Sequence, residues 1–293
     1  MQTSRAAGRA PTPRIVREMR IVSAALVVSA LLFGASCRLA ARAGPDVMLR
    51  VMTYNIASGH GDLDRTAATI AAEAPDLVAL QEVDVRWDAR SQFVDQATAL
   101  AARLHMEVRF APIYQLAGAT VGALPREFGV ALLSRFPIVR WVNHPLTRLS
   151  TQQPNATPTP MPGFLEATVT VRDVEIRIFN THTDYRPDPG VRVRQVAEML
   201  ATIGERAMPT LLFGDLNAPP DAMELQPLLA ALHDVWPASS GPGLTYPAIA
   251  PTKRIDYVLT TNQFRVIRAS VPDTDASDHR PVVVDLVVSR APM

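Results

Sequence analysis

The sequence predicts an α/β fold of the α+β kind, in which two mixed β-sheets pack face to face beneath outer helices. Three observations predict it. Short apolar segments with strand character recur along the chain and outnumber the segments with helical spacing. Hydrophobic residues make up 48% of the 293 residues, which is enough for one large core. Charged residues make up only 19%, which excludes a disordered or charge-tract protein.

The first half of the chain alternates strands and helices. Asp62 is placed to cap a helix over residues 63–73, and Pro75 ends it. A second helix is expected over residues 94–104. Strands are expected over residues 48–56, 77–80, 129–133 and 138–142.

The second half is richer in strands. Two alternating segments around Arg172 and Asp173 predict a hairpin, and a helix is expected over residues 190–203, ending at Gly204. The expected strands span residues 165–171, 174–180, 210–213, 255–260, 264–271 and 281–288. Two long proline-rich segments, 111–127 and 144–163, are expected to be loops that frame the mouth of a site.

The N-terminal segment differs from the rest of the chain. Five arginines precede an apolar stretch from Ile21 to Ser36, and a small-residue site follows at residues 41–43. This order is typical of an export signal. Residues 1–43 are therefore predicted to be a signal peptide or an N-terminal membrane or lipid anchor, and residues 44–293 one catalytic domain. The protein is expected to act outside the cytoplasm.

Cys37 is the only cysteine, and its sequence context faintly resembles a bacterial lipoprotein cleavage site. Signal cleavage, lipid attachment at Cys37 and a retained anchor are the three alternatives. The apolar stretch is short for a span of about 30 Å of hydrocarbon, which favours the first two. Membrane contact is thus expected only through this segment. Because residues 44–293 contain no cysteine, the folded part has no disulfide.

The charge changes once the N-terminal segment is set aside. Residues 1–43 hold seven arginines and one glutamate, so residues 44–293 carry a net charge of −5, against +1 for the whole chain. An acidic domain lacks the basic surface that non-specific nucleic-acid binding requires. Nucleic acid is therefore a disfavoured partner, and nothing in the sequence indicates a protein partner.

Acidic, amide and histidine side chains cluster at the predicted strand ends. Mg²⁺ prefers hard oxygen ligands from carboxylates and amides, and hydrolysis of a phosphate ester needs an activated water and stabilised phosphoryl oxygens. The sequence contains no Cys/His set for zinc, no glycine-rich nucleotide loop and no serine nucleophile elbow. The clustered residues are Asn55, Glu82, His182, Asp215, Asn217, Asp256, Asp278 and His279.

These residues lie in six short motifs whose order resembles the endonuclease/exonuclease/phosphatase superfamily, which includes deoxyribonuclease I. The resemblance spans residues 48–288. It implies a four-layer α/β/β/α sandwich like that of deoxyribonuclease I, with the site at one end of the two sheets. The motifs are Thr53-Tyr54-Asn55-Ile56, Gln81-Glu82-Val83, Asn180-Thr181-His182, Gly214-Asp215-Leu216-Asn217, Arg254-Ile255-Asp256-Tyr257 and Ser277-Asp278-His279-Arg280-Pro281.

The resemblance also implies roles for these side chains. Glu82 is the principal ligand of Mg²⁺, or of Mn²⁺, with Asn55 and Asp278 as direct or water-mediated ligands. Asp215 and Asn217 hold the attacking water or the phosphate oxygens. His279, oriented by Asp256, acts on the scissile phosphate, and His182 donates to a phosphate oxygen or to the leaving group. Two candidates remain for the general base, the His279–Asp256 pair and Asp215.

Other residues carry weaker predictions. Glu127 is a candidate to orient His182, with a solvated loop position as the alternative. Arg90 and Arg126 are candidates for substrate phosphate contacts, or ordinary surface arginines. Val130 stands where many relatives have asparagine, which removes one polar contact to substrate. Asp256, taken alone, would be read as an ion-pair partner of Arg254.

The sequence therefore predicts an exported, Mg²⁺-dependent phosphoesterase, most simply a phosphodiesterase, in which water attacks phosphorus in line. A secreted endonuclease or exonuclease on DNA or RNA is one alternative. A lipid or inositol-phosphate phosphoesterase is another, and an enzyme for small phosphorylated metabolites a third. A non-catalytic binding protein on the same fold is disfavoured because every metal and histidine position is filled.

Overall fold

The computed structural model describes residues 46–205, 207–237 and 240–288. The predicted signal or anchor, with Cys37, lies outside the described residues. Within the described ranges, no helix combines the length and the apolar character needed to cross a membrane.

The first sheet has six strands, in the order β11-β12-β1-β2-β4-β3. Strands β1 and β2 are parallel, and the other neighbours are antiparallel, so the sheet is mixed as predicted. Its strands are β1 (Val47–Asn55), β2 (Leu77–Val85), β3 (Glu107–Leu116), β4 (Arg126–Ser134), β11 (Phe264–Ser270) and β12 (Val282–Val288).

The second sheet also has six strands, in the order β5-β6-β7-β8-β10-β9. Only β7 and β8 are parallel. Its strands are β5 (Ile138–Arg148), β6 (Thr159–Val171), β7 (Val174–His182), β8 (Thr210–Asp215), β9 (His233–Asp234) and β10 (Asp256–Thr260). The predicted hairpin joins β6 to β7, and its turn places Arg172 and Asp173 at positive φ.

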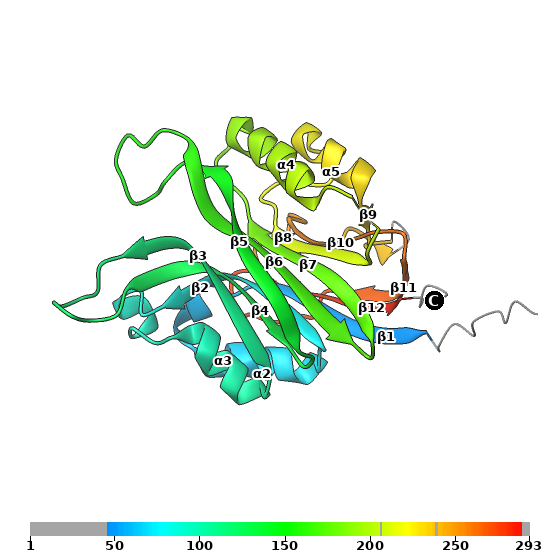
Figure 1. Ribbon diagram of the computed structural model, residues 1–293, viewed down its shortest axis with the longest axis horizontal. Helices are drawn as coiled ribbons and strands as arrows, with labels where there is room; N and C mark the ends of the chain where they lie inside the picture. Colours follow the sequence, from blue (N-terminus) through cyan, green and yellow to red (C-terminus); the bar gives the residue numbers. More distant parts are fainter. Residues whose placement is uncertain (1–45, 206, 238–239, 289–293) are drawn as a thin grey trace, which may run out of the picture. The chain divides into compact units, whose positions relative to one another are not determined.

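Helices cover the outer face of each sheet, which gives the four layers expected (Figure 1). Helices α2 (Leu63–Glu73) and α3 (Gln96–Leu104) cover the first sheet, and α4 (Gly190–Ile203) and α5 (Gln226–Ala231) cover the second. Three apolar clusters separate the layers: one between the two sheets, one beneath α2 and α3, and one beneath α4 and α5. Short 3₁₀ turns span Ala57–Gly61, Ala89–Ser91 and Met223–Leu225.

Local sequence signals explain where the main helices begin and end. The Asp62 carboxylate accepts hydrogen bonds from the backbone N–H groups of Asp64 and Arg65, which caps α2 as predicted. Helix α4 spans the predicted residues and ends at Gly204, whose φ is positive. Both helices bury one apolar face, so their packing and their caps act together.

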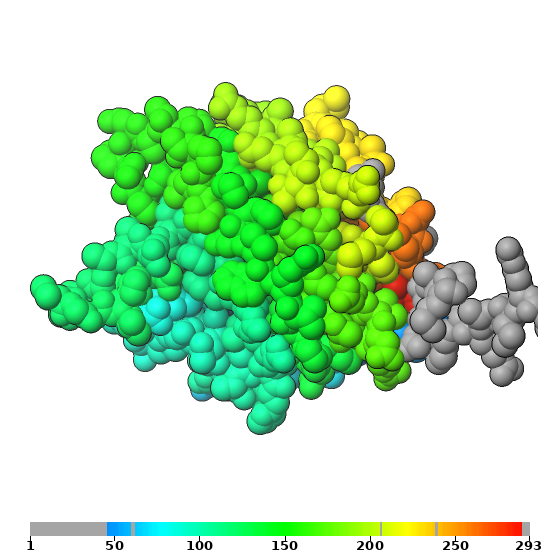
Figure 2. Space-filling model, in the orientation of Figure 1, coloured from blue at the N-terminus to red at the C-terminus, as the bar shows by residue number. Residues whose placement is uncertain are grey.

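About half of each proline-rich segment lies in strands, so the loops are shorter than predicted. Strand β3 takes up residues up to Leu116, while β5 continues to Arg148 and β6 starts at Thr159. Prolines are tolerated here because β3 and β5 are edge strands, and the start of β6 pairs only with β5. The remaining β3–β4 and β5–β6 loops project separately at one end of the sandwich (Figures 1 and 2).

Candidate functional site

The predicted site residues gather where strands of both sheets end or begin. Parallel strands β1 and β2 end at the same edge of the first sheet, and parallel strands β7 and β8 end at the same edge of the second. Asn55, His182 and Asp215 are the last residues of β1, β7 and β8, and Asp256 is the first residue of β10. Glu82 lies within β2, Asn217 follows β8, and Asp278 and His279 precede β12.

The Asn55 side chain connects the two sheets. Its amide nitrogen donates to Glu82 Oε1 and to Asp215 Oδ2, each at 3.0 Å, and lies 3.5 Å from His279 Nε2. Its amide oxygen accepts from the Ala57 N–H at 3.0 Å. Asn55 thus lies beside Glu82 as predicted, but it turns its nitrogen rather than its oxygen toward the site. It acts here as a hydrogen-bond donor that holds two carboxylates in place.

Glu82 occupies a strained backbone position. Its φ is 55°, in the left-handed region that side-chain-bearing residues adopt at a cost. The strain coincides with a shift in the register of β2 against β4 between Leu80 and Val83. This bulge re-aims the Glu82 side chain toward the cleft, which it lines together with Asp278.

The two histidines flank Asp215. His182 Nε2 lies 3.5 Å from Asp215 Oδ2 and 4.0 Å from Glu82 Oε1. His279 Nε2 lies 3.6 Å from the same Asp215 oxygen. Burial raises the pKa of Asp215, and the nearby charge of Asp256 raises it further, against the opposing effect of the two histidines.

His279 and Asp256 form a buried pair, in which His279 Nδ1 lies 2.9 Å from Asp256 Oδ2. Burial alone would lower the pKa of His279, but the charge and hydrogen bond of Asp256, helped by Asp215 and Asp278, raise it to about 10. The Tyr246 ring packs on the imidazole, with the ring centroids 4.7 Å apart. Asp256 does not pair with Arg254, which bonds instead to Asp234 at 2.6 Å.

Asn217 shapes the turn that follows β8. Its φ is 49°, a conformation that asparagine tolerates well, and its backbone N–H donates to Asp215 Oδ1 at 2.9 Å. Its side-chain nitrogen donates to the Thr183 carbonyl at 3.1 Å, and the residue lines the cleft. Asn217 therefore combines the turn position with a place in the site.

The site opens into a cleft of about 450 Å³. Tyr185, Tyr246 and Lys253 also line it, and none of them belongs to the six sequence motifs. Lys253 lies three residues before Asp256. Its closeness to the motif around Asp256 was the one sequence feature that could have placed Lys253 near the site. Tyr185 and Tyr246 are brought in from loops, for which the sequence offered no signal.

Glu127 does not reach His182. Its carboxylate accepts from Arg86 Nη2 at 3.2 Å and from Gln115 Nε2 at 2.9 Å, so it stabilises the ends of β3 and β4. The prediction that Glu127 orients His182 is therefore wrong in this structure. Val130, at the position where a polar residue would have faced substrate, is fully buried in the core between the sheets.

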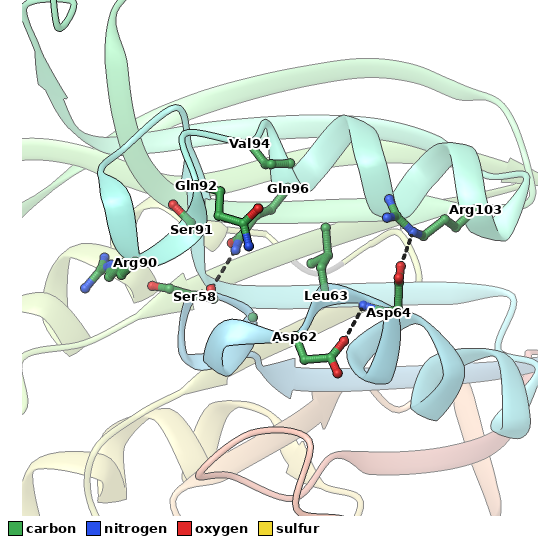
Figure 3. A pocket seen from close by; sticks show the side chains of 11 residues that line it. Ser58, Asp62, Leu63, Asp64, Arg90, Ser91, Gln92, Val94, Gln96 and Arg103 are labelled. Atoms are coloured by element: carbon green, nitrogen blue, oxygen red, sulfur yellow. Dashed lines mark hydrogen bonds and ion pairs between the residues drawn. The ribbon is translucent and has the colours of Figure 1, made fainter.

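The two predicted arginine contacts also lie elsewhere. Arg90 donates to both oxygens of the buried Asp84 carboxylate and lines a separate polar hollow (Figure 3). That hollow shares no lining residue with the cleft, and dashed lines in Figure 3 mark the Gln96–Ser58 and Asp64–Arg103 contacts that close its walls. Arg126 donates to the Ala117 carbonyl at 3.0 Å. Neither arginine lines the cleft.

The side chains at the cleft suit a divalent cation. Glu82 and Asp278 supply carboxylates at its wall, and Asp215 and Asp256 lie behind them, within 4.8 Å of a His279 nitrogen. Among the described residues, none of these four carboxylates forms an ion pair with arginine or lysine. One Asp256 oxygen is buried without a hydrogen-bond partner. The cleft therefore holds more carboxylates than side-chain cations to neutralise them. Mg²⁺ prefers such hard oxygen ligands.

Solved structures share this fold. An endonuclease/exonuclease/phosphatase from Beutenbergia cavernae is 27% identical, with a TM-score of 0.64 over 82% of this chain and 72% of that one. A mannosyl-6-phosphatase from Bacteroides thetaiotaomicron is 19% identical, with a TM-score of 0.60 over 81% of this chain and 99% of that one. The human nocturnin catalytic domain is 20% identical, with a TM-score of 0.61 over 83% and 96%.

Sequence comparison assigns the family. No curated protein sequence matches the chain. The sequence profile of the Endonuclease/Exonuclease/phosphatase family matches residues 52–279, which include all eight predicted site residues. The chain therefore belongs to the endonuclease/exonuclease/phosphatase family, whose members hydrolyse phosphoester bonds.

Proposed function

We propose that this chain is an exported phosphodiesterase that depends on a divalent metal, Mg²⁺ by preference and Mn²⁺ as the alternative. The observation that carries the proposal is the convergence of Asn55, Glu82, His182, Asp215 and His279 on one cleft, each within 4.0 Å of another member of the set. Export rests on the N-terminal sequence pattern alone.

Glu82 and Asp278 would hold the metal, and Asn55 would keep Glu82 in place through its 3.0 Å hydrogen bond. A bound divalent cation supplies positive charge to a phosphoryl oxygen and so stabilises the charge that develops there. The remaining steps belong to the protein's own side chains.

Water attacks phosphorus in line with the leaving oxygen, and its proton passes to Asp215, because His279, with its pKa raised to about 10, already carries a proton at neutral pH and would donate to a phosphoryl oxygen. These two groups lie 3.6 Å apart, and Asp256 fixes the imidazole from its other side at 2.9 Å. His182, on the opposite side of Asp215, donates a hydrogen bond to a phosphoryl oxygen or a proton to the leaving oxygen. Asn217 completes the wall that faces the phosphate oxygens.

The charge of the domain bears on the substrate. The net charge of −5 over residues 44–293 disfavours a long nucleic acid, because counterion release is the main source of affinity for such polymers. A compact phosphate ester, whether a lipid headgroup, an inositol phosphate or another small metabolite, agrees better with a 450 Å³ cleft.

The test is release of p-nitrophenol from bis-p-nitrophenyl phosphate and from p-nitrophenyl phosphate, with Mg²⁺ and with EDTA. Metal-dependent cleavage of the diester is expected, and Glu82→Gln and His279→Ala should each reduce turnover by about 100-fold or more. Cleavage of the monoester alone would make the protein a phosphatase. Near wild-type turnover in either variant would refute the mechanism. If the wild-type protein cleaved neither substrate, the proposed activity would be refuted.

A further inference from the structure

A second cavity opens directly beside the cleft. It has a volume of about 190 Å³ and shares Glu82, His182 and Tyr185 with the cleft, so the two spaces adjoin. Ile113 and Phe128 give it an apolar wall, and the segments that contribute to it include the ends of β3 and β5. The segments expected to frame the cleft therefore border this side cavity instead.

Arg148 lies in the polar wall of the side cavity and is 7% exposed. Its guanidinium donates to three backbone carbonyls, those of Pro162 at 3.0 Å, Gly163 at 3.0 Å and His182 at 2.7 Å. These partners are neutral, and Arg148 forms no ion pair with any carboxylate of the described residues. Burial lowers the pKa of Arg148 to about 10, so it remains a cation at neutral pH.

A buried cation that no carboxylate contacts directly is costly, and Asp184 and Glu198 act on Arg148 only through space. The three carbonyls fix the guanidinium but cannot cancel its charge, and they leave some of its five N–H donors unused. A bound anion would supply the missing charge and accept those donors in the fork geometry that arginine offers to phosphate and carboxylate groups.

Two more side chains in the same wall have unused polar atoms. Thr183 Oγ1 and Gln195 Nε2 are both buried and have no hydrogen-bond partner among the described residues. The Gln195 side-chain oxygen accepts from the Asp184 N–H at 2.9 Å. This bond fixes the orientation of the amide group, so its nitrogen is the atom that is free to donate. Buried donors without a partner are rare in folded proteins, and a ligand is one explanation for them.

The other charged side chains at this cavity do not form an ion pair with Arg148. Asp184 is bonded by Arg186, its neighbour in the cavity lining, so these two charges balance each other. Glu82 lies at the border with the cleft and faces Asn55 and His182. Among the described residues, Arg148 is thus the one arginine in the lining of the side cavity that bonds no carboxylate.

We propose that the side cavity is a second oxyanion subsite, which binds a phosphate or carboxylate group that the substrate carries in addition to its scissile phosphate. The inference rests on the proposed function for the identity of the cleft, and it makes the preferred substrate a compact molecule with two acidic groups. Arg148, Thr183 and Gln195 are the residues that determine this preference.

The experiment measures binding rather than turnover, with probes that cannot be hydrolysed. Calorimetry on the full-length protein with Mg²⁺ compares alkylphosphonates with α,ω-bisphosphonates and ω-phosphonoalkanoates of the same chain length, over a series of lengths. At one length or more, a doubly acidic probe is expected to bind about tenfold more tightly than its singly acidic match. Bisphosphonate preference assigns a phosphate to the subsite, and phosphonoalkanoate preference assigns a carboxylate.

Two variants test whether the preference for doubly acidic probes arises in the side cavity. Thr183→Val removes a hydroxyl that has no hydrogen-bond partner among the described residues, so the ligand-free protein should melt at the same or a higher temperature. Gln195→Glu keeps the shape and places a negative charge in the wall. Both should bring the preference toward unity. Arg194→Gln, an exposed neighbour on α4 with the same change in charge, should leave it intact.

Equal affinity for matched probes at every chain length would overturn the subsite, and so would a preference that survives in both variants. Because binding is read without catalysis, a clear preference in a protein that cleaves no diester would keep the subsite and refute the proposed activity instead.

Discussion

The Asp256 carboxylate lies 2.9 Å from Nδ1 of His279, on the side of the ring away from Asp215, and both side chains are buried. This contact fixes which nitrogen of the imidazole faces the cleft. It also places a full negative charge behind a ring that must hold or transfer a proton.

Asp256→Asn tests the contribution of that charge. Asparagine keeps the size of the side chain but removes the charge that stabilises the imidazolium, so kcat is expected to fall by about 100-fold to 10,000-fold. The measurement is kcat on bis-p-nitrophenyl phosphate. Asp234→Asn is the matched control, because Asp234 pairs with Arg254 close by in the sequence but does not contact His279. Similar rates for the two variants would contradict the assignment.

The strained backbone of Glu82 makes an unusual prediction for stability. Glycine in a strand is ordinarily about 0.5–1 kcal/mol less favourable than alanine. At a φ of 55° the order should reverse, and Glu82→Gly is expected to be about 1 kcal/mol more stable than Glu82→Ala in urea unfolding with EDTA. The same pair at Glu175, in β7 with ordinary φ, should show the ordinary order. An alanine advantage at both positions would show that Glu82 is unstrained.

Gly214 is needed because β8 passes close to β7. A Cβ at Gly214 would lie 2.6 Å from the Thr181 carbonyl oxygen, a backbone atom that cannot move aside easily. Gly214→Ala is therefore expected to cost about 1–3 kcal/mol and to lower turnover, because the neighbouring Asp215 shifts with the strand. Gly190→Ala is the comparison, since its Cβ would meet only the Asp188 side chain, at 3.3 Å. Chemical denaturation and the diester assay report the two effects.

Glu166 gives a pH-dependent prediction away from the site. Burial alone would raise the pKa of Glu166, but hydrogen bonds from Arg177 and His144, each 2.6 Å long, lower it below the ordinary value of 4.5. A carboxyl with a depressed pKa adds stability above its unfolded pKa and loses it as the pH falls through its folded pKa. Glu166→Gln should therefore be less stable than wild type at pH 7, by about 1 kcal/mol.

The difference between wild type and Glu166→Gln should shrink steadily as the pH falls below 4.5. Urea unfolding of both proteins across this range checks it. A difference that stays constant with pH would mean that the Glu166 charge contributes nothing.

The sequence indicated α2, α3, α4 and the central strands because each carries a strong local signal, whereas the short helix α5 was not predicted. Asp62 and Gly204 mark helix ends, and apolar segments such as the one in β12 can only be buried. Strand β3 and the extensions of β5 and β6 escaped prediction because proline and polar residues interrupt their alternation. Whether a segment with proline can join a sheet depends on its neighbours, which only the topology reveals.

For the site, the motifs located the residues but not their partners. Seven of the eight predicted residues lie where strands end or begin, Glu82 lies at the bulge within β2, and the roles of all eight stay predictions. The orientation of the Asn55 amide depends on a backbone N–H two residues away, and the partners of Glu127 lie in β3 and just after β2. Arg148 gave no signal, because its significance comes from its burial against carbonyls, with no directly bonded carboxylate among the described residues.

The hydrogen bond between Asn55 and Asp215 joins the two sheets directly, since each residue ends a strand of a different sheet. The reaction centre is thus divided between two sheets, each of which has its own ladder of backbone hydrogen bonds. A displacement of about 1 Å would separate the two halves of the centre. Solvents or temperatures that loosen the interface between the sheets should abolish turnover before they change the far-UV circular dichroism spectrum. Turnover would then report the alignment of the two sheets more sensitively than secondary structure does.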